Sequence, residues 1–207
     1  AYTTSTTKDY EHIINHSGAR SIIISSHELV QKAIPAVLKS EKCQNIIKIN
    51  NDKEEYKEPV NIILWNSLTI KDNQNKDFNF EENIKKHKRS DTACIIYTSG
   101  TGGTPKGVML SHGAMLSNCS GANELLKLLI NDLDEIRFLS WLPLSHSYEH
   151  TLQFFYLGVG GQIYFAEGID KLLVNMSEAK PHIMTAVPRF YDSLHTRISQ
   201  GLKKQGK

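Results

Sequence analysis

A short segment rich in glycine and hydroxyl residues lies between the apolar runs Ile95–Tyr97 and Val108–Leu110. Glycine permits positive φ angles, so successive backbone N–H groups can point at one anion. Hydroxyl side chains add further donors, and the ammonium group of Lys106 adds a positive charge. Together these groups predict a loop that binds phosphate. We name it the phosphate loop, and its residues are Thr98, Ser99, Gly100, Thr101, Gly102, Gly103, Thr104, Pro105 and Lys106.

Two commoner phosphate-binding motifs do not fit this segment. A Walker A loop has a glycine directly before its lysine and a helix directly after it, whereas here Pro105 precedes Lys106 and a strand-like run follows. The dinucleotide fingerprint requires a third glycine at the position that Pro105 occupies. The remaining alternative is a glycine-rich turn between two strands, but a turn needs neither four hydroxyl groups nor a lysine.

Other clusters of reactive side chains carry weaker signals. Two pairs of histidines have a spacing of four residues, His12 with His16 and His146 with His150. Neither pair has the H-E-x-x-H pattern or a third ligand nearby, so surface or pocket histidines are favoured over a metal site. A serine nucleophile is disfavoured at Ser99, because its turn motif would need a glycine two residues earlier.

The elements that must position the loop alternate between short apolar runs and helical patterns. The runs are near-continuously apolar, which is typical of strands buried on both faces of a parallel sheet. They lie at Ser21–Ser25, Asn45–Ile49, Val60–Trp65, Ala93–Thr98, Val108–Leu110, Arg137–Leu142, Gln162–Phe165 and His182–Val187. Helical patterns lie near residues 8–17, 27–39, 113–130, 146–157, 169–178 and 188–204. This alternation predicts an α/β fold with a layered, mostly parallel sheet flanked by helices.

The composition is that of a globular protein and excludes several function classes. With 24 basic and 22 acidic residues the net charge is +2, so the sequence lacks the basic excess of a nucleic-acid binder. Three cysteines without C-x-x-C spacing argue against a disulfide framework and favour a reducing compartment. No stretch reaches the ~18 apolar residues of a membrane span. Residues 71–90 are rich in asparagine and lysine and predict a solvated connection with a short helix from Glu81.

The phosphate loop resembles the motif (S/T)SG(S/T)TGxPKGV of the adenylate-forming superfamily, which includes acyl-CoA synthetases and luciferases. Gly102 replaces the usual threonine, a mild change in a loop that works largely through its backbone. FLSWLPLSHSYEHT at Phe138–Thr151 is similar to the next motif, and its LPLSHxYE form is typical of long-chain fatty acyl-CoA synthetases. TAVPRFYDSLHTRI at Thr185–Ile198 resembles their VPRxYEKI segment, with Asp192 in place of glutamate. The first 25 residues also match, so the resemblance covers essentially the whole chain.

The resemblance implies that the parent enzyme activates a long-chain fatty acid with ATP. The carboxylate attacks the α-phosphorus and releases pyrophosphate, and the CoA thiol then displaces AMP from the acyl-adenylate. Lys106 and His146 are expected to be catalytic, and the first hydroxyl of the motif, on Thr98, is expected to contact Mg²⁺. The expected ATP-binding residues are Thr98, Ser99, Gly100, Thr101, Gly102, Gly103, Thr104, Lys106 and Ser147. His146 and its neighbours are expected to border the substrate and adenine side.

The resemblance also shows which motifs are missing. No Y-G-x-T-E, T-G-D or R-x-K-D segment follows Arg189, so residues 1–207 are expected to be one partial N-terminal domain that is inactive alone. Two rival interpretations stay open, a non-catalytic remnant and a generic nucleotide-binding module. The expected partners of the parent enzyme are a fatty acid, ATP and CoA, and no nucleic acid. A cytoplasmic location is expected, with peripheral contact with the inner face of a membrane as the alternative; acyl-chain length and oligomeric state stay open.

Overall fold

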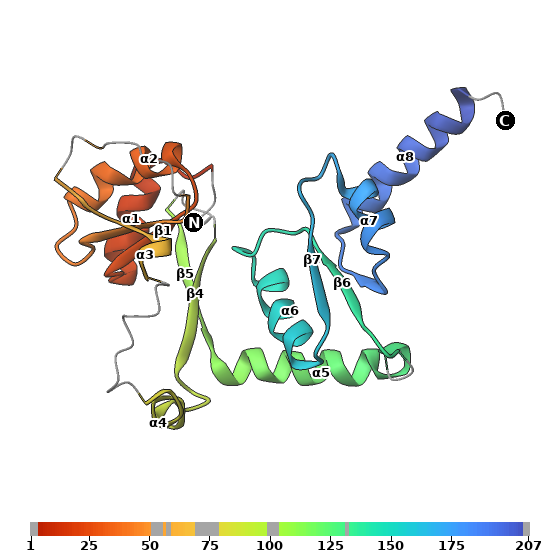
Figure 1. The fold of residues 1–207 in the computed structure, drawn as a ribbon, viewed down its shortest axis with the longest axis horizontal. Helices are drawn as coiled ribbons and strands as arrows, with labels where there is room; N and C mark the ends of the chain where they lie inside the picture. The colour runs from red at the N-terminus through yellow and green to blue at the C-terminus, as the bar shows by residue number, and fades with distance from the viewer. Residues whose placement is uncertain are drawn as a thin grey trace. The chain divides into compact units, whose positions relative to one another are not determined.

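The computed structural model describes residues 4–50, 56, 59–68, 79–98, 104–130 and 133–204. The chain separates into two compact units, which comprise Ala1–Gly113 and Ala114–Lys207. Figure 1 shows the elements of both units, and each unit has a hydrophobic core of its own. Among the described residues, no helix is both long and apolar enough to cross a membrane.

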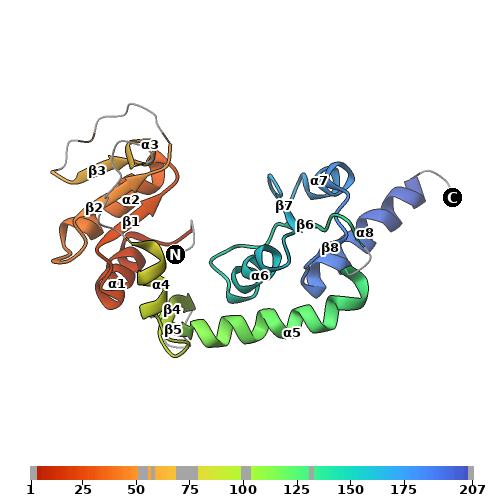
Figure 2. The same cartoon turned by 60° about the horizontal axis from the view of Figure 1, so that its bottom comes forward.

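The first unit contains a parallel three-stranded sheet in the order β1-β2-β3. Isoleucines occupy matched positions, because Ile22 pairs with Ile46 and Ile46 pairs with Ile62. Helix α2 connects β1 to β2 and packs against α1 (Figure 2). The elements are α1 (Thr7–Ser17), β1 (Ser21–Ile24), α2 (His27–Leu38), β2 (Asn45–Lys48), β3 (Asn61–Leu64) and α3 (Trp65–Leu68). The buried apolar residues are Tyr10, Ile14, Ile24, Val30, Ala33, Ile34, Ala36, Val37, Cys43 and Ile46.

Sequence signals define both ends of helix α1. At its start, Thr6 and Asp9 form a capping box, in which the Thr6 N–H donates to Asp9 Oδ2 at 2.7 Å and the Asp9 N–H donates to Thr6 Oγ1 at 3.3 Å. The backbone and side-chain hydrogen bonds from Thr6 lower the pKa of the Asp9 carboxyl. At its end, Gly18 has a φ of 67°, a left-handed conformation that glycine adopts without a steric penalty. These caps fix the length and the position of α1.

The first unit also contains an antiparallel hairpin of β4 (Thr92–Thr98) and β5 (Lys106–Ser111). The apolar runs predicted both strands, but the antiparallel pairing departs from the parallel arrangement that they favoured. An apolar run reports burial rather than strand direction, and a short connection permits only antiparallel pairing. Of the predicted connection at 71–90, residues 71–78 lie outside the described residues, and Phe80–Lys86 forms the short, mostly exposed helix α4.

The second unit contains a parallel three-stranded sheet with β6 in the centre, in the order β7-β6-β8. Phe138 on β6 is fully buried and stacks on Tyr156 with 4.1 Å between the ring centroids. Helix α5, which begins directly after β5, supplies Cys119, Ala122 and Leu126 to this core. The elements are α5 (His112–Ile130), β6 (Arg137–Ser140), α6 (Ser147–Gly158), β7 (Gln162–Phe165), α7 (Leu172–Ala179), β8 (Ile183–Met184) and α8 (Pro188–Lys204).

Candidate functional site

The predicted phosphate loop joins the two strands of the β4–β5 hairpin. Its first residue, Thr98, ends β4 and its last, Lys106, begins β5, and these two residues are paired in the ladder. Thr104 and Pro105 lie directly before β5. The middle of the loop lies outside the described residues; it comprises Ser99, Gly100, Thr101, Gly102 and Gly103. The structure therefore brings both ends of the loop together and leaves its middle undescribed.

The described loop residues present polar groups to solvent. The side chains of Thr98, Thr104 and Lys106 are exposed. No hydrogen bond or ion pair joins the Lys106 ammonium to another residue in the part of the chain that the structure describes. An exposed ammonium group without an internal partner can approach an anion without first breaking an internal contact. The arrangement suits phosphate oxygens, which accept hydrogen bonds from lysine and hydroxyl donors.

Gly107 has a steric role directly after the loop. It pairs with Tyr97 across the hairpin, and a Cβ atom at Gly107 would lie 2.9 Å from Cγ2 of Ile95 and 3.2 Å from Cζ of Tyr97. Real Cβ atoms avoid such distances, so only glycine lets these two side chains lie over β5. The glycine that follows the lysine therefore positions Tyr97, the residue directly before the loop.

Helix α1 contacts both ends of the loop through two histidines. The His12 Nε2 atom lies 2.8 Å from the carbonyl oxygen of Pro105, and the His16 Nδ1 atom lies 2.8 Å from the hydroxyl oxygen of Tyr97. Among the described residues, no group of three histidine, cysteine, aspartate or glutamate side chains could hold a metal ion. The spacing of the two histidines was visible in the sequence, but nothing in the sequence indicated their partners on the hairpin.

The second group of predicted site residues lies at the start of α6, in the second unit. His146 is the N-cap of this helix, and its Nδ1 accepts a hydrogen bond from the Tyr148 N–H at 3.3 Å. His146 and Ser147 are both exposed. The ring of His150, four residues after His146, makes an edge contact with Phe154. The Nε2 atom of His146 thus faces no partner among the described residues and is available to a ligand.

Sequence reasoning missed a buried carboxyl group close to His146. Glu149 is fully buried and accepts hydrogen bonds from Ser140 Oγ at 2.6 Å, Thr185 Oγ1 at 2.9 Å and Gln153 Nε2 at 3.2 Å. Burial, together with the charge of Glu149, raises the pKa of the Tyr156 hydroxyl to about 12. A signal was present, since Glu149 belongs to the LPLSHSYEHT stretch that supports the resemblance. We name Glu149, Ser140, Thr185 and Gln153 the Glu149 network.

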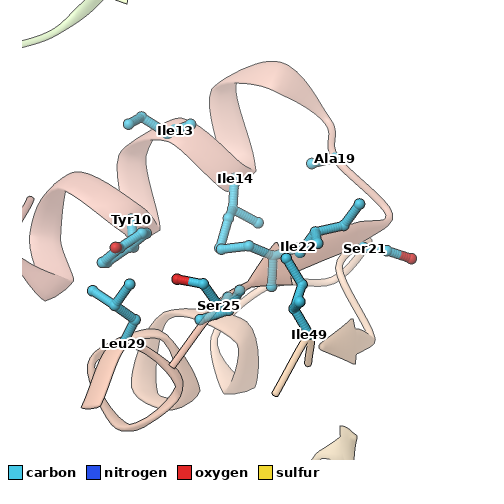
Figure 3. Close-up of a pocket in the computed structure, with 11 residues that line it drawn as sticks. Tyr10, Ile13, Ile14, Ala19, Ser21, Ile22, Ser25, Leu29 and Ile49 are labelled. Atoms are coloured by element: carbon cyan, nitrogen blue, oxygen red, sulfur yellow. The ribbon is translucent and has the colours of Figure 1, made fainter. Parts of the chain in front are cut away.

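The first unit contains an apolar cavity of about 320 Å³, and Figure 3 shows the side chains that line it. Side chains of α1 and β1, such as Ile14 and Ile22, line it together with Leu29 of α2 and Ile49. None of the described phosphate-loop residues lines this cavity. It therefore lies outside the candidate site.

A second apolar cavity, of about 280 Å³, lies within the second unit. Among the described residues that line it, Arg189 is the only charged one. The other lining residues are Trp141, Leu142, Ile169, Leu172, Leu173, Val187, Phe190, Ser193 and Leu194. An apolar cavity with one guanidinium group suits a ligand that is mostly hydrocarbon and carries one negative charge.

Comparison with known sequences identifies the family of this chain. The family model of the AMP-binding enzymes matches residues 1–207. Long chain acyl-CoA synthetase 2 of Arabidopsis thaliana is 28% identical over 208 residues, which cover 95% of this chain and 30% of that protein. Long chain acyl-CoA synthetase 5 of the same plant is 32% identical, over 92% of this chain and 30% of that protein. The chain thus spans about 30% of the length of these curated relatives.

Comparison with solved structures identifies the fold. A putative long-chain-fatty-acid CoA ligase from Rhodopseudomonas palustris matches with a TM-score of 0.72 at 14% identity, over 92% of this chain and 44% of that one. ATP-bound MatB from the same organism matches with a TM-score of 0.64 at 19% identity, over 94% of this chain and 35% of that one. At such low identity the likeness shows the fold alone. It agrees with the α/β fold that the sequence predicts.

Proposed function

This chain belongs to the family of AMP-binding enzymes, and from that premise we propose that it carries the triphosphate-binding loop of an AMP-forming long-chain fatty acid–CoA ligase. The names of the relatives support this substrate class, and the matched structure that holds ATP supports the nucleotide. The chain spans about 30% of those relatives, so the proposed activity is that of the longer parent enzyme. Its substrates are ATP, a fatty acid and CoA.

The placement of the loop ends in the β4–β5 hairpin carries the proposal. The ladder pairs Thr98 with Lys106, so a hydroxyl group and an ammonium group lie on adjacent strands at the same end of the hairpin. Thr104 adds a second exposed hydroxyl group directly before β5. A hairpin turn without a binding role would not require this combination of donors and charge.

The loop residues would stabilise the negative charge that develops during the first step. The fatty acid carboxylate attacks the α-phosphorus of ATP, the bond to the β-phosphate oxygen breaks, and pyrophosphate leaves. Donors that are already in place around the departing pyrophosphate lower the barrier without further reorganisation. Lys106 supplies the charge, and the hydroxyl groups of Thr98 and Thr104 supply hydrogen bonds. In the second step, the CoA thiolate attacks the acyl carbon and AMP leaves.

The residues present also fit a magnesium ion that arrives with ATP. Mg²⁺ usually keeps several waters and is held by substrate phosphates and one or two protein oxygens. The exposed Thr98 hydroxyl offers one such oxygen at the end of β4. When bound, the ion would neutralise charge on the phosphate oxygens. We assign no other described residue to it.

His146 and Ser147 are proposed to border the acyl and adenine side of the substrates. Both are exposed at the start of α6, and the capping bond to Tyr148 occupies Nδ1 of His146. The Nε2 atom would therefore be the one that contacts a substrate.

The three free cysteines support a reducing compartment, and we propose the cytoplasm, with the inner face of a membrane as the alternative.

Lys106→Ala in the full-length enzyme tests the proposed function. We expect turnover in the ATP–pyrophosphate exchange assay to fall by about 10²–10³-fold, the usual effect of removing one electrostatic contact to the transition state. The free energy of unfolding should change by less than about 0.5 kcal/mol, because the side chain is exposed. Lys127→Ala, at an exposed lysine of α5, is the matched control and should retain full activity.

The same experiment separates the rival interpretations. Near-normal exchange in Lys106→Ala would overturn the assignment of the phosphate loop. An absence of exchange in the wild-type full-length protein, with any fatty acid from short to long chain, would favour a non-catalytic remnant. Exchange that depends on a fatty acid supports the ligase.

A further inference from the structure

Two hydrogen bonds join helix α1 to Tyr97, directly before the loop, and to Pro105, near the end of the loop. Tyr97 directly precedes Thr98 and pairs with His16, while Pro105 directly precedes Lys106 and pairs with His12. The histidines are four residues apart on one helix, so one face of α1 contacts both Tyr97 of β4 and Pro105, directly before β5. We name His12, His16, Tyr97 and Pro105 the histidine clamp.

The rings of the histidine clamp also pack against one another. His12 and His16 are stacked with 5.2 Å between their centroids, and each makes an edge contact with Tyr97, at 6.1 Å and 5.8 Å. Burial raises the pKa of the Tyr97 hydroxyl, so this group stays protonated and keeps its hydrogen-bonding capacity. The clamp is therefore held by ring contacts as well as by hydrogen bonds.

The bond to Pro105 has a defined direction. A carbonyl oxygen can only accept, so His12 must carry a proton on Nε2 and donate it to Pro105. This carbonyl belongs to the peptide group that joins Pro105 to Lys106. The proline ring already fixes φ on one side of that peptide, so a hydrogen bond to the carbonyl restricts the remaining rotation. The hydrogen bond from His12 thus restricts the orientation of the peptide group that precedes Lys106.

The hairpin needs such support because it forms a sheet of only two strands. An isolated two-stranded hairpin is only marginally stable in water. Thr98 and Lys106 form the last pair of the ladder, at the end where the loop joins the two strands. The contacts from α1 to Tyr97 and Pro105, the residues directly before the two members of this pair, support both ends of the loop.

We propose that His12 is a positioning residue for ATP: its bond to the Pro105 carbonyl orients Lys106 toward the phosphates. This inference rests on the proposed function of the loop. His12 itself contacts no substrate in this proposal and acts through the peptide group of Pro105 and Lys106. The alternative is that His12 only packs α1 against the hairpin, in which case its ring matters and its N–H does not.

Two substitutions in the full-length enzyme separate these roles. His12→Phe keeps an aromatic ring but removes the donor, and we expect it to raise KM for ATP about 3- to 10-fold, the size of one lost hydrogen bond. KM for the fatty acid should stay unchanged. His12→Gln keeps an N–H donor at a similar reach and should restore KM for ATP to within about twofold of wild type. Rescue by glutamine is not expected of a residue that only packs.

A matched control is available in the same unit. His27 starts α2 and its Nδ1 lies 2.9 Å from the Tyr56 hydroxyl, so it repeats the histidine–tyrosine chemistry away from the hairpin. His27→Phe should leave KM for ATP at the wild-type value. If His12→Phe does not fold, the tautomer of His12 in the wild-type protein, read from ¹⁵N NMR shifts, keeps the test decisive. A proton on Nε2 is expected, and a neutral ring with its proton on Nδ1 would overturn the proposal.

Lys106→Ala, measured in parallel, separates the two proposals. If Lys106→Ala abolishes exchange while His12→Phe keeps a wild-type KM for ATP, the positioning role of His12 is overturned and the function of the loop stands. If Lys106→Ala is fully active, the proposed function of the loop is overturned, and the positioning role of His12, which rests on it, is overturned as well. Equal impairment of His12→Phe and His12→Gln would also overturn the positioning role.

Discussion

Replacing Gly107 by alanine puts a methyl group where the side chains of Ile95 and Tyr97 already lie. We expect this overpacking to lower the free energy of unfolding by about 1–3 kcal/mol, measured by urea denaturation. Gly121→Ala is the control, and it should raise the free energy of unfolding. Gly121 lies within α5, and a methyl group there would meet nothing within 4 Å. It should stabilise the protein by about 0.5–1 kcal/mol. A neutral result at Gly107 would contradict the packing described for Tyr97.

The raised pKa of Tyr156 predicts how stability depends on alkaline pH. The pKa is about 12 in the folded protein and 10.0 for a free tyrosine, so the folded state holds this proton more tightly. The stability that results is fully present below pH 10 and is lost as the pH rises through 12, so the free energy of unfolding falls over that range. Tyr156→Phe should make this decrease shallower in urea titrations between pH 9 and about 12.

Tyr164→Phe is the control for this pH dependence. Tyr164 is exposed on β7, so its removal should leave the slope of stability against pH at the wild-type value. Equal slopes for Tyr156→Phe and the wild type would show that the buried hydroxyl does not contribute. At the scale of single residues, the sequence predicted a role for Lys106 from its type and neighbours, whereas the burial of Glu149 depends on packing between distant segments and could not be predicted.

Helix α1 depends on its N-terminal capping box. In Thr6→Ala the side-chain acceptor for the Asp9 N–H is lost, and we expect the free energy of unfolding to fall by about 1 kcal/mol. Ser120→Ala is the control, since the Ser120 hydroxyl bonds to the Leu116 carbonyl within α5 and alanine is the better helix former there. It should be neutral or slightly stabilising. Both changes can be measured by circular dichroism during urea unfolding.

Most helices and strands could be predicted from the sequence, and the exceptions have physical reasons. Apolar runs such as the one at Ser21–Ile24 are short and bounded by polar residues, which defines a strand. Helix α3 was missed because its four residues cannot show helical periodicity. The helical spacing of the sequence places Leu129 on the same apolar face of α5 as Leu126, but Leu126 packs against the core whereas Leu129 is 63% exposed.

The candidate site could be predicted only where its parts are close in sequence. The phosphate loop is continuous, so its residue types and order were enough to predict it. His12 and Pro105 are 93 residues apart, and their contact arises only when α1 packs beside the hairpin. No local pattern reports such a pair. The histidine spacing instead raised a metal site as an alternative, because the spacing of ligands and of hydrogen-bonding pairs on a helix is the same.

At the scale of the whole molecule, the predicted site residues are divided between the two units. Thr98 and Lys106 belong to the first unit, and His146 and Ser147 belong to the second. One family model nevertheless covers both units. Neither unit alone therefore carries all the residues that the proposed reaction uses.

The 207-residue chain by itself should bind ATP only weakly. The loop offers contacts to the phosphates, and such contacts are weakened by water and salt when they are exposed. We expect a Kd no better than about 1 mM, or about −4 kcal/mol, in titration calorimetry with Mg-ATP. Lys106→Ala should abolish even this binding. Micromolar affinity would contradict the prediction and would favour the generic nucleotide-binding module.

The hydrogen bonds of the Glu149 network predict how its residues vary among related proteins. Its carboxylate accepts hydrogen bonds from β6, from α6 itself and from Thr185, which follows β8. Loss of one donor leaves part of a buried charge unsatisfied, whereas simultaneous replacement of the carboxylate and its donors by apolar residues removes the requirement. Descendants of a common ancestor are therefore expected to keep these positions together or to exchange them together. We therefore expect Ser140, Glu149 and Thr185 to covary among related proteins, although they lie far apart in the sequence.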